Sequence, residues 1–171
     1  MWYVIQTHTG EEDKLVAIIK RMVPKDCYEE CFSIKRERFR KIGGKYEVEL
    51  YPLFPAYVFI VTEEPKRMFL ELKRVPKLTK LLGDQQDSFF CVDEEEERFL
   101  RSVQDKEHVV RRSLVEVDAQ GQIVWADGPV GIYFDRIVKQ RLRKRYVWIE
   151  QEFLGKKREV YLGIRLKEDE M

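Results

Sequence analysis

The chain has 171 residues, of which 44% are hydrophobic and 37% charged, and its formal net charge is +1. This length suits one medium-sized domain, or one domain with a small module, and the apolar content excludes a disordered protein. Because the total charge is close to neutral, it favours no class of partner. Any prediction about binding therefore depends on where the charges lie along the chain.

The thiol and imidazole side chains predict neither a disulfide framework nor a zinc site. The cysteines Cys27, Cys31 and Cys91 are odd in number and form no CxxC pair, and the chain has two histidines. Reduced thiols are typical of cytoplasmic proteins. The first residues lack the basic and apolar segments of a signal peptide, and no run approaches the roughly 20 apolar residues of a membrane span. We therefore expect a cytoplasmic protein that contacts no membrane.

The chain is expected to begin with a strand followed by a helix. Residues 2–7 are rich in aromatic and β-branched side chains, which favour strands. Apolar residues then recur at helical spacing from Leu15 to Met22, and Pro24 ends the pattern. A helix is therefore expected over 11–23.

A β-hairpin is expected after this helix. Apolar residues in 31–34 suggest a strand, and its far end, 35–41, is basic. Gly43 and Gly44 form a typical two-residue hairpin turn. Apolar and acidic residues alternate over 46–50, as expected for a strand with one face in solvent.

An uncharged stretch, 53–61, is the most distinctive part of this charge-rich sequence. Pro55 fixes its own φ and favours extended geometry at Phe54. The residues from Tyr57 to Val61 are aromatic or β-branched, which predicts a central strand buried on both faces of a sheet. A second interpretation stays open, because alternate side chains point to opposite faces and one of the aromatics could reach a partner protein.

Two further helices and a linker are expected next. Pro65 is well placed in the first turn of one helix. Asp93 can cap the other, which is expected to end near Val103. The acidic run 94–97 either complements the dipole of this helix, which is the simpler interpretation, or forms an acidic surface patch. Residues 104–115 are dense in charge at their start and are the best candidate for a linker.

Residues 116–171 change to short strands and turns and are expected to form a small β-barrel. Clusters of basic residues on such a barrel indicate a nucleic-acid surface. A solvated charged surface is the alternative for the first cluster, and it is equally favoured for the second. The strand candidates are 123–125, 136–138, 146–149 and 160–162. The residues predicted to bind RNA are Lys139, Arg141, Arg143, Lys144 and Arg145 in the first cluster and Lys156, Lys157 and Arg158 in the second.

No pattern of residues predicts an active site. His8 and His108 lie far apart in the sequence, and neither has a nucleophile motif nearby. Gly43 and Gly44 lack the Lys-Ser/Thr pair that follows the glycines of a phosphate loop, and the acidic run 94–97 lacks the spacing of a calcium loop. We therefore expect a protein that is not an enzyme and that holds no metal ion or cofactor.

Several of these segments together resemble the NusG family of transcription elongation factors. Residues 2–10 are similar to that family's opening strand and turn, and 53–59 are similar to its most recognisable stretch. Residues 127–131 resemble the start of its KOW motif. The end of the chain, 153–164, is most similar to the specialised antiterminator branch called LoaP. The resemblance covers nearly the whole chain in the expected order.

The resemblance implies an α+β fold with two domains. The first, over 1–103, would be an NGN-like α/β sandwich in which helices flank an antiparallel sheet. After the linker 104–115, the second domain, over 116–171, would be a KOW β-barrel. We expect the protein to act as a monomer.

The resemblance also implies partners for both domains. The first domain would bind the clamp helices of RNA polymerase through an apolar surface that includes Phe54, Tyr57 and Phe59. Arg21, on the outer side of the first helix, would approach the non-template DNA strand. In the LoaP branch, the KOW barrel binds a hairpin of nascent RNA.

These implications predict an antitermination factor that works without catalysis. By bridging the two sides of the polymerase cleft, the first domain would disfavour the clamp opening that accompanies pausing and termination. The alternative is a protein of translation, either associated with the ribosome, because ribosomal proteins also contain KOW barrels, or built on an RRM-like sheet whose aromatics stack on RNA bases. The near-neutral charge and the apolar character of 53–61 argue against both forms of the alternative.

Overall fold

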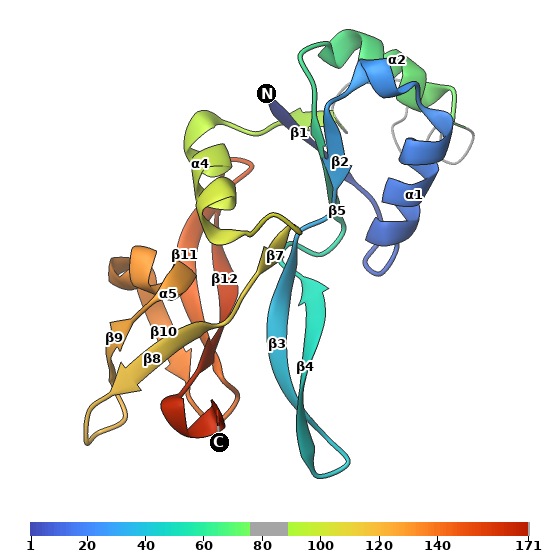
Figure 1. Ribbon diagram of the computed structural model, residues 1–171. Coiled ribbons are helices and arrows are strands. Elements are labelled where there is room, and N and C mark those ends of the chain that lie inside the picture. The colour runs from blue at the N-terminus through green and yellow to red at the C-terminus, as the bar shows by residue number, and fades with distance from the viewer. Residues whose placement is uncertain (76–88, 171) are drawn as a thin grey trace. The chain divides into compact units, whose positions relative to one another are not determined.

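The computed structural model describes residues 1–75 and 89–170, and the chain divides into two compact units (Figure 1). The units are Met1–Ile34 with Phe54–Glu97, and Lys35–Leu53 with Arg98–Met171. The chain thus enters the second unit twice, because this unit contains the predicted hairpin as well as the C-terminal part of the sequence. The domain boundaries expected from the sequence remain a prediction.

The first unit contains an antiparallel sheet of four strands in the order β2-β5-β1-β6. This arrangement confirms the expected antiparallel sheet, and it places the uncharged stretch in an inner strand. The strands are β1 (Trp2–Gln6), β2 (Glu30–Phe32), β5 (Tyr57–Val61) and β6 (Phe89–Cys91).

Helices α1 (Glu12–Met22) and α2 (Pro65–Lys73) pack on this sheet and share one hydrophobic core with it. Pro65 occupies the first turn of α2, where its missing N–H costs no helical hydrogen bond. A 3₁₀ turn, Lys25–Cys27, follows α1. The core members include Ile5, Leu15, Ile19, Cys31, Val58, Ile60, Met68 and Leu72.

The side chains of β5 that point to the other face of the sheet, away from this core, pack among aromatic rings. The Phe59 ring is stacked on the Phe32 ring, with ring centroids 5.8 Å apart. The Trp2 indole makes an edge-to-face contact with each of these two rings. Phe59 is 1% exposed and Val58 is fully buried. The prediction of a strand buried on both faces is therefore confirmed.

A tight turn over Phe54–Tyr57 leads into β5, and it places alanine in an unfavourable conformation. The Tyr57 N–H donates to the Phe54 carbonyl across 3.3 Å, and Ala56 has a φ of 77°. Pro55 followed by a residue of positive φ is the pattern of a type II turn, in which glycine is the preferred second residue. Here the Cβ of Ala56 is held in the left-handed region, at a cost of roughly 1–2 kcal/mol.

Ala56→Gly is therefore expected to raise the free energy of unfolding by up to about 1 kcal/mol, because the relief of strain exceeds the entropy that glycine adds to the unfolded chain. Denaturant unfolding of the two proteins measures this difference. Ala17→Gly, at an exposed position within α1, is the matched control and should destabilise the protein by roughly 0.5–1 kcal/mol. A loss of stability in both variants would show that the turn is not strained.

Helix α4 (Glu94–Val103) follows the prediction at both ends. The Asp93 carboxylate accepts a hydrogen bond from the Glu96 N–H at 2.8 Å, which caps the first turn. The four acids of 94–97 occupy that same turn, where they complement the helix dipole. The acidic run is thus explained by the helix.

The predicted hairpin belongs to the second unit and consists of β3 (Lys35–Ile42) and β4 (Lys45–Pro52). Gly43 and Gly44 both have positive φ, 57° and 83°, as a two-residue turn of type I′ requires. A short strand, β7 (Val109–Val110), pairs in parallel with the start of β3. Part of the expected linker is therefore attached to the hairpin by backbone hydrogen bonds.

The C-terminal strands form a five-stranded half-barrel in the order β10-β11-β12-β8-β9. The strand candidates 123–125, 146–149 and 160–162 are confirmed, and 136–138 is confirmed from Ile137 onward because Arg136 ends a 3₁₀ turn. The expected closed barrel is a half-barrel, because β9 and β10 form no ladder with each other. The Gln140 side chain links these two edges, donating to the Gly121 carbonyl and accepting from the Ile123 N–H. The strands are β8 (Ser113–Val117), β9 (Ile123–Ala126), β10 (Ile137–Arg141), β11 (Tyr146–Phe153) and β12 (Lys156–Arg165).

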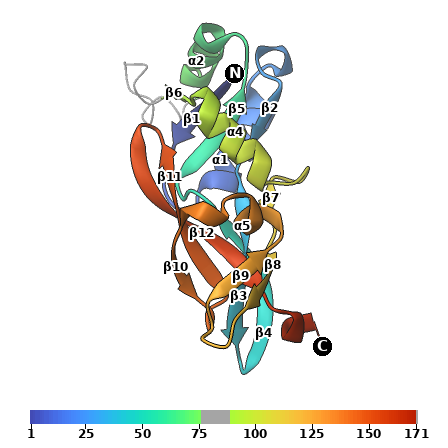
Figure 2. The ribbon, with the colours of Figure 1, turned by 90° about the vertical axis from the view of Figure 1, so that its left-hand side faces the viewer.

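A short helix, α5 (Gly128–Ile132), packs on this sheet (Figure 2). The Asp127 carboxylate fixes its start by accepting from the Leu114 N–H at 2.6 Å. Gly131 is required by close packing, since a Cβ there would overlap the Ala126 carbonyl. Two 3₁₀ turns, Phe134–Arg136 and Lys167–Glu170, precede and follow the strands β10 to β12.

Candidate nucleic-acid interface

The first basic cluster lies on the hairpin of β10 and β11 in the second unit. Lys139 and Arg141 are on strand β10, opposite Trp148 and Tyr146. Directly opposite residues of an antiparallel pair share a face, so these cations lie beside aromatic rings. The Lys139 ammonium is 4.7 Å from the centre of the Trp148 ring system. The structure therefore brings the predicted cations together on one strand and the turn that follows it.

Arg145 differs from the rest of this cluster because it is held in an ion pair. Its guanidinium donates two hydrogen bonds of 2.9 Å to the Asp169 carboxylate, and its side chain is 16% exposed. These hydrogen bonds raise the pKa of Arg145. Burial alone would raise the pKa of Asp169, but the hydrogen bonds from Arg145 and the Leu166 N–H lower it overall. Arg145 thus attaches the C-terminal turn to the half-barrel.

Arg143 and Lys144 are exposed in the turn, and neither has a carboxylate partner among residues 1–75 and 89–170. Arg141 is exposed and equally unpaired within that part of the chain. With Lys139, these residues form what we call the basic turn: Lys139, Arg141, Arg143 and Lys144. Their charges are available to a ligand.

The second basic cluster lies at the opposite end of the hairpin formed by β11 and β12. Lys156 and Lys157 are exposed directly after the turn at Leu154 and Gly155. The Arg158 Nε donates to the Phe153 carbonyl at 3.1 Å, and its guanidinium lies over the Phe153 ring. Since β11 has eight residues, about 25 Å of strand separates the two clusters. The structure does not bring them together.

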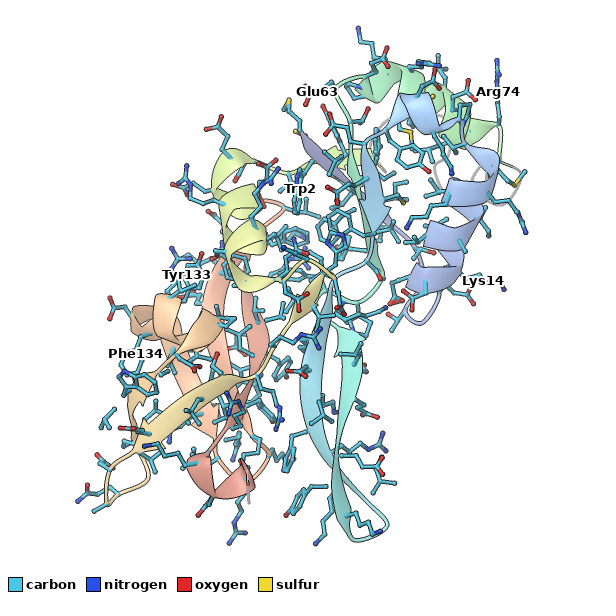
Figure 3. The ribbon with its side chains drawn as sticks, viewed as in Figure 1. Trp2, Lys14, Glu63, Arg74, Tyr133 and Phe134 are labelled. Atoms are coloured by element: carbon cyan, nitrogen blue, oxygen red, sulfur yellow. The ribbon has the colours of Figure 1, made fainter. Side chains whose placement is uncertain are left out.

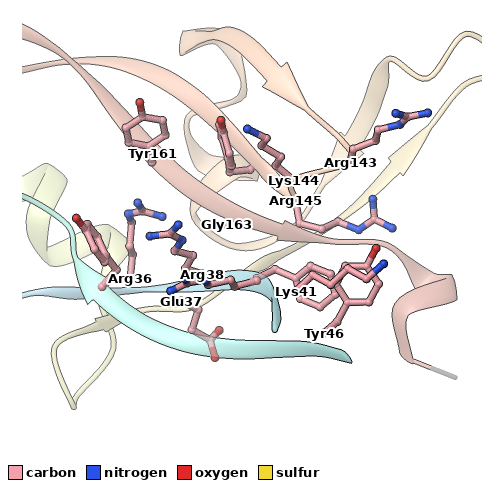
Figure 4. Close-up of a pocket in the computed structure, with 14 residues that line it drawn as sticks. Arg36, Glu37, Arg38, Lys41, Tyr46, Arg143, Lys144, Arg145, Tyr161 and Gly163 are labelled. Atoms are coloured by element: carbon pink, nitrogen blue, oxygen red, sulfur yellow. The ribbon is translucent and has the colours of Figure 1, made fainter. Parts of the chain in front are cut away.

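A groove of about 570 Å³ lies between the basic turn, β12 and the β3–β4 hairpin, all within the second unit (Figure 4). The sequence indicates that the end of β3 is basic, but no local pattern in it indicates that β3 lies near the C-terminal cluster. The residues that line the groove are Arg36, Glu37, Arg38, Phe39, Arg40, Lys41, Tyr46, Tyr51, Arg143, Lys144, Arg145, Tyr146, Tyr161 and Gly163.

Gly163 sets the distance between β12 and the hairpin. A Cβ at this position would lie 2.6 Å from the Glu37 carbonyl oxygen and 2.9 Å from the Arg112 Cγ, closer than such atoms approach. The absence of a side chain at Gly163 therefore lets the β3 backbone lie against β12, and the groove depends on this approach.

Aromatic rings surround the cations of the groove. The Arg36 guanidinium lies 5.2 Å from the ring centres of both Tyr51 and Tyr161. Burial, followed by the nearby charge of Arg38, lowers the pKa of Arg36. Near the tip of the hairpin, the Tyr46 ring stacks on Phe39, 4.7 Å between centres and 9° from parallel. The lining thus combines positive charge with flat rings.

The carboxylates near the groove are bound by neighbouring groups. The Glu37 carboxylate turns away from the groove (Figure 4) and accepts from the Arg112 N–H at 2.8 Å. It also lies 3.7 Å from the Arg111 guanidinium. On β4, Glu49 pairs with Arg38 and Arg40 at 3.8 and 3.4 Å. Positive charge therefore dominates the groove.

The residues predicted to contact RNA polymerase lie in the first unit, at the start of β5. Phe54 and Phe59 are buried, and Tyr57 is half-buried, with part of its side chain in solvent. Arg21 lies on the exposed face of α1, as does Lys14, which projects outward in Figure 3. Of the predicted apolar contact residues, Tyr57 is the one that a partner can reach without rearrangement.

Other kinds of site find no support in the described part of the chain. Across 1–75 and 89–170, no three His, Cys, Asp or Glu side chains are grouped so that they could hold a metal ion. None of the helices described is long and apolar enough to cross a membrane. The thiol of Cys31 is buried, which raises its pKa to about 12 and keeps it protonated and unreactive.

Comparison with known proteins gives one family. The family model described as "Transcription termination factor nusG" matches residues 1–101. Among solved structures, the chain is similar to the one described as "Domain interaction in Thermotoga maritima NusG", with 19% sequence identity and a TM-score of 0.53. That similarity covers 95% of this chain and 92% of the Thermotoga chain, and at this identity it concerns the fold. A comparison with curated proteins gave no match.

Proposed function

Because the chain belongs to the NusG family of transcription factors, which bind RNA polymerase, we propose that it is a specialised antitermination factor that also binds a structured nascent RNA. The single observation that carries the RNA-binding part is the basic turn, where four exposed cations lie together without carboxylate partners in the described structure. The proposal assigns polymerase binding to residues 1–103 and RNA binding to residues 116–171.

Polymerase binding is assigned to the surface around Tyr57. This residue follows the strained turn at Ala56, its backbone pairs with Gln6 in the sheet, and its side chain is half exposed, so a partner can reach it. The buried rings of Phe54 and Phe59 support the turn and the strand beneath it. On α1, the exposed Arg21 is assigned to the phosphates of the non-template DNA strand.

The basic turn suits a hairpin of RNA for two reasons. Its cations can neutralise several phosphates at once, which gives affinity without sequence preference. Arginine can also bind a guanine edge with two parallel hydrogen bonds where a bulge or loop opens the otherwise inaccessible major groove. Arg141 and Arg143 are exposed and unpaired in the described structure and are assigned this role. The second cluster, around Lys156, is assigned to phosphates farther along the RNA.

The proposed mechanism is a shift between two states of the polymerase. A protein that binds both sides of the cleft in the closed state, and only one side in the open state, stabilises the closed state by the difference in binding free energy. A preference of about 1.4 kcal/mol for the closed state changes the equilibrium between the closed and open states tenfold. A modest preference is therefore enough to lengthen processive transcription. RNA held by the basic turn would keep the factor near the polymerase that made that RNA.

A reconstituted transcription reaction tests this function. The template encodes, upstream of an intrinsic terminator, an RNA hairpin that the protein binds. Purified polymerase should read through this terminator more often when the full-length protein is present. Deleting the hairpin from the template should remove most of the effect. The alternative, a role in translation, predicts co-purification with ribosomes rather than with polymerase. Unchanged termination together with ribosome binding would overturn the proposal.

A further inference from the structure

Arg36 is a buried cation whose hydrogen-bonding groups are unused. The residue is 8% exposed, its backbone pairs with Tyr51 in the sheet, and its side chain makes no ion pair or hydrogen bond with any residue of 1–75 or 89–170. Its described contacts are with the rings of Tyr51 and Tyr161, 5.2 Å from each ring centre. Figure 4 shows Arg36 and Arg38 reaching from β3 into the space between the hairpin and β12. The Arg36 guanidinium nitrogens are not among the enclosed polar atoms of the described structure, so they face the groove, where a ligand can supply the acceptor.

We propose that the groove around Arg36 binds a single-stranded segment of RNA, with a phosphate at the Arg36 guanidinium and a base stacked on a tyrosine ring. The proposal rests on the RNA-binding function assigned to the basic turn and extends it, because the same RNA would continue from the turn into the groove. Neither the family match nor the similarity to a solved structure assigns a ligand to these residues.

The guanidinium chemistry favours a phosphate. Tyrosine rings interact with the flat faces of a guanidinium, but its five N–H groups point outward in its plane and need acceptors. A phosphate oxygen pair matches two of these N–H groups in parallel. Because Arg36 is buried, such hydrogen bonds form in a medium of low dielectric constant and are stronger than at the surface.

The charge around the groove favours the same class of ligand. Lys41, Arg143 and Lys144 line it without carboxylate partners among the described residues. The Glu37 carboxylate is turned away and bound to the Arg112 backbone. A polyanion would therefore meet uncompensated positive charge along the groove.

The rings favour a nucleic acid over an acidic peptide. Tyr46 is 59% exposed and lies parallel to Phe39, and the Lys41 ammonium lies 5.6 Å from its ring centre, so a base that stacks on the exposed part of this ring would have a phosphate-binding cation beside it. Tyr161 is 39% exposed and is set among Tyr146 and Trp148. Stacking on such rings tolerates every base and is typical of single-strand binding sites. A peptide of glutamates would use the charges but would have no planar groups for these rings.

The groove is also continuous with the basic turn. Arg143 and Lys144 belong both to the turn and to the groove lining. An RNA hairpin held at the turn would therefore place one of its single-stranded flanks at the mouth of the groove. The structure thus predicts that a flank increases the affinity of a hairpin for this protein.

Binding of fluorescent RNAs to the full-length protein tests the proposal. The probes are an octamer of uridine, a blunt hairpin and the same hairpin with a five-nucleotide single-stranded flank. Arg36→Gln and Tyr46→Ser are each expected to weaken binding of the octamer by roughly tenfold. Both should abolish the advantage of the flank while leaving the affinity for the blunt hairpin unchanged. Arg36→Lys should fail to restore octamer binding, because an ammonium lacks the planar fork.

One control and two independent tests make the result decisive. Arg74→Gln removes an exposed arginine of the first unit and should change nothing. Tyr46→Ser alters an exposed side chain, so it tests the groove even if Arg36→Gln proves unstable on heating. Gly163→Ala changes no charge but pushes β3 away from β12, and it should weaken octamer binding as well.

Two outcomes would overturn the groove site. Octamer binding that is equal in wild type, Arg36→Gln and Tyr46→Ser would place single-stranded RNA elsewhere. Displacement of the octamer by an octamer of glutamate at equal concentration would show a site for acidic peptides instead. Failure of the blunt hairpin to bind wild type would count against the basic turn, whereas the octamer measurement would still decide on the groove.

Discussion

Replacing Lys139, Arg141, Arg143 and Lys144 together with alanine is expected to lower the affinity of the full-length protein for its RNA hairpin on the order of 100-fold at low salt. Each phosphate contact contributes about one unit to the slope of log affinity against log salt, so the slope should fall by roughly two units when Arg141 and Arg143 read guanine edges and by up to about four when they contact phosphates. The measurement is a salt titration of hairpin binding to the wild type and to the fourfold variant.

The second basic cluster provides the matched control. Lys156 and Lys157 are equally exposed and lie at the other end of the β11–β12 hairpin. Replacing both with alanine removes two charges where the fourfold variant removes four, and the loss of affinity for each charge removed should be smaller if the basic turn holds the hairpin. An equal loss for each charge removed in the two variants would indicate a diffuse basic surface, and unchanged binding in the fourfold variant would move the RNA site elsewhere.

Arginine and lysine variants separate the two kinds of contact within the basic turn. A phosphate-contacting residue can be replaced by either cation with little loss. An arginine that reads a guanine edge cannot, and its replacement by lysine should cost about 1–3 kcal/mol on the cognate hairpin and nothing on a mutated hairpin. Arg141→Lys and Arg143→Lys are therefore informative. Arg145 is unsuitable for this test, since its ion pair with Asp169 would also be lost.

Local sequence patterns were sufficient to predict most of the elements. The uncharged run after Pro55 predicted an inner strand, and its residues Val58 to Ile60 are buried on both faces. The two glycines at 43 and 44 predicted a hairpin turn and have the positive φ that such a turn needs. These features depend on neighbours in the sequence, and for that reason they can be read from it.

Contacts between distant residues could not be predicted in the same way. Arg36 meets Tyr161 across 125 positions of sequence, and no local pattern indicates that β3 lies against β12. The closed barrel was expected because short strands recur, yet the edge strands are linked by the Gln140 side chain and not by a ladder. A count of charges likewise could not distinguish Arg145, which is paired, from Arg143, which is exposed.

Tyr57→Ala is expected to weaken the binding of RNA polymerase by about 2 kcal/mol or more, which corresponds to roughly 30-fold in affinity. Aromatic side chains at the centre of an interface commonly carry this much of the binding energy, and Tyr57 is a half-exposed residue whose backbone pairs with Gln6 in the sheet. The measurement is a titration of purified polymerase with labelled full-length protein.

The neighbouring residues determine which controls are valid. Phe59→Ala cannot serve, because removing a ring packed between Phe32 and Trp2 would destabilise the fold by about 3–5 kcal/mol. Tyr57→Phe keeps the ring and should bind polymerase nearly as well as wild type. RNA hairpin affinity should be the same in all Tyr57 variants, since the basic turn belongs to the other unit. Wild-type polymerase affinity in a folded Tyr57→Ala protein would exclude this surface as the polymerase contact.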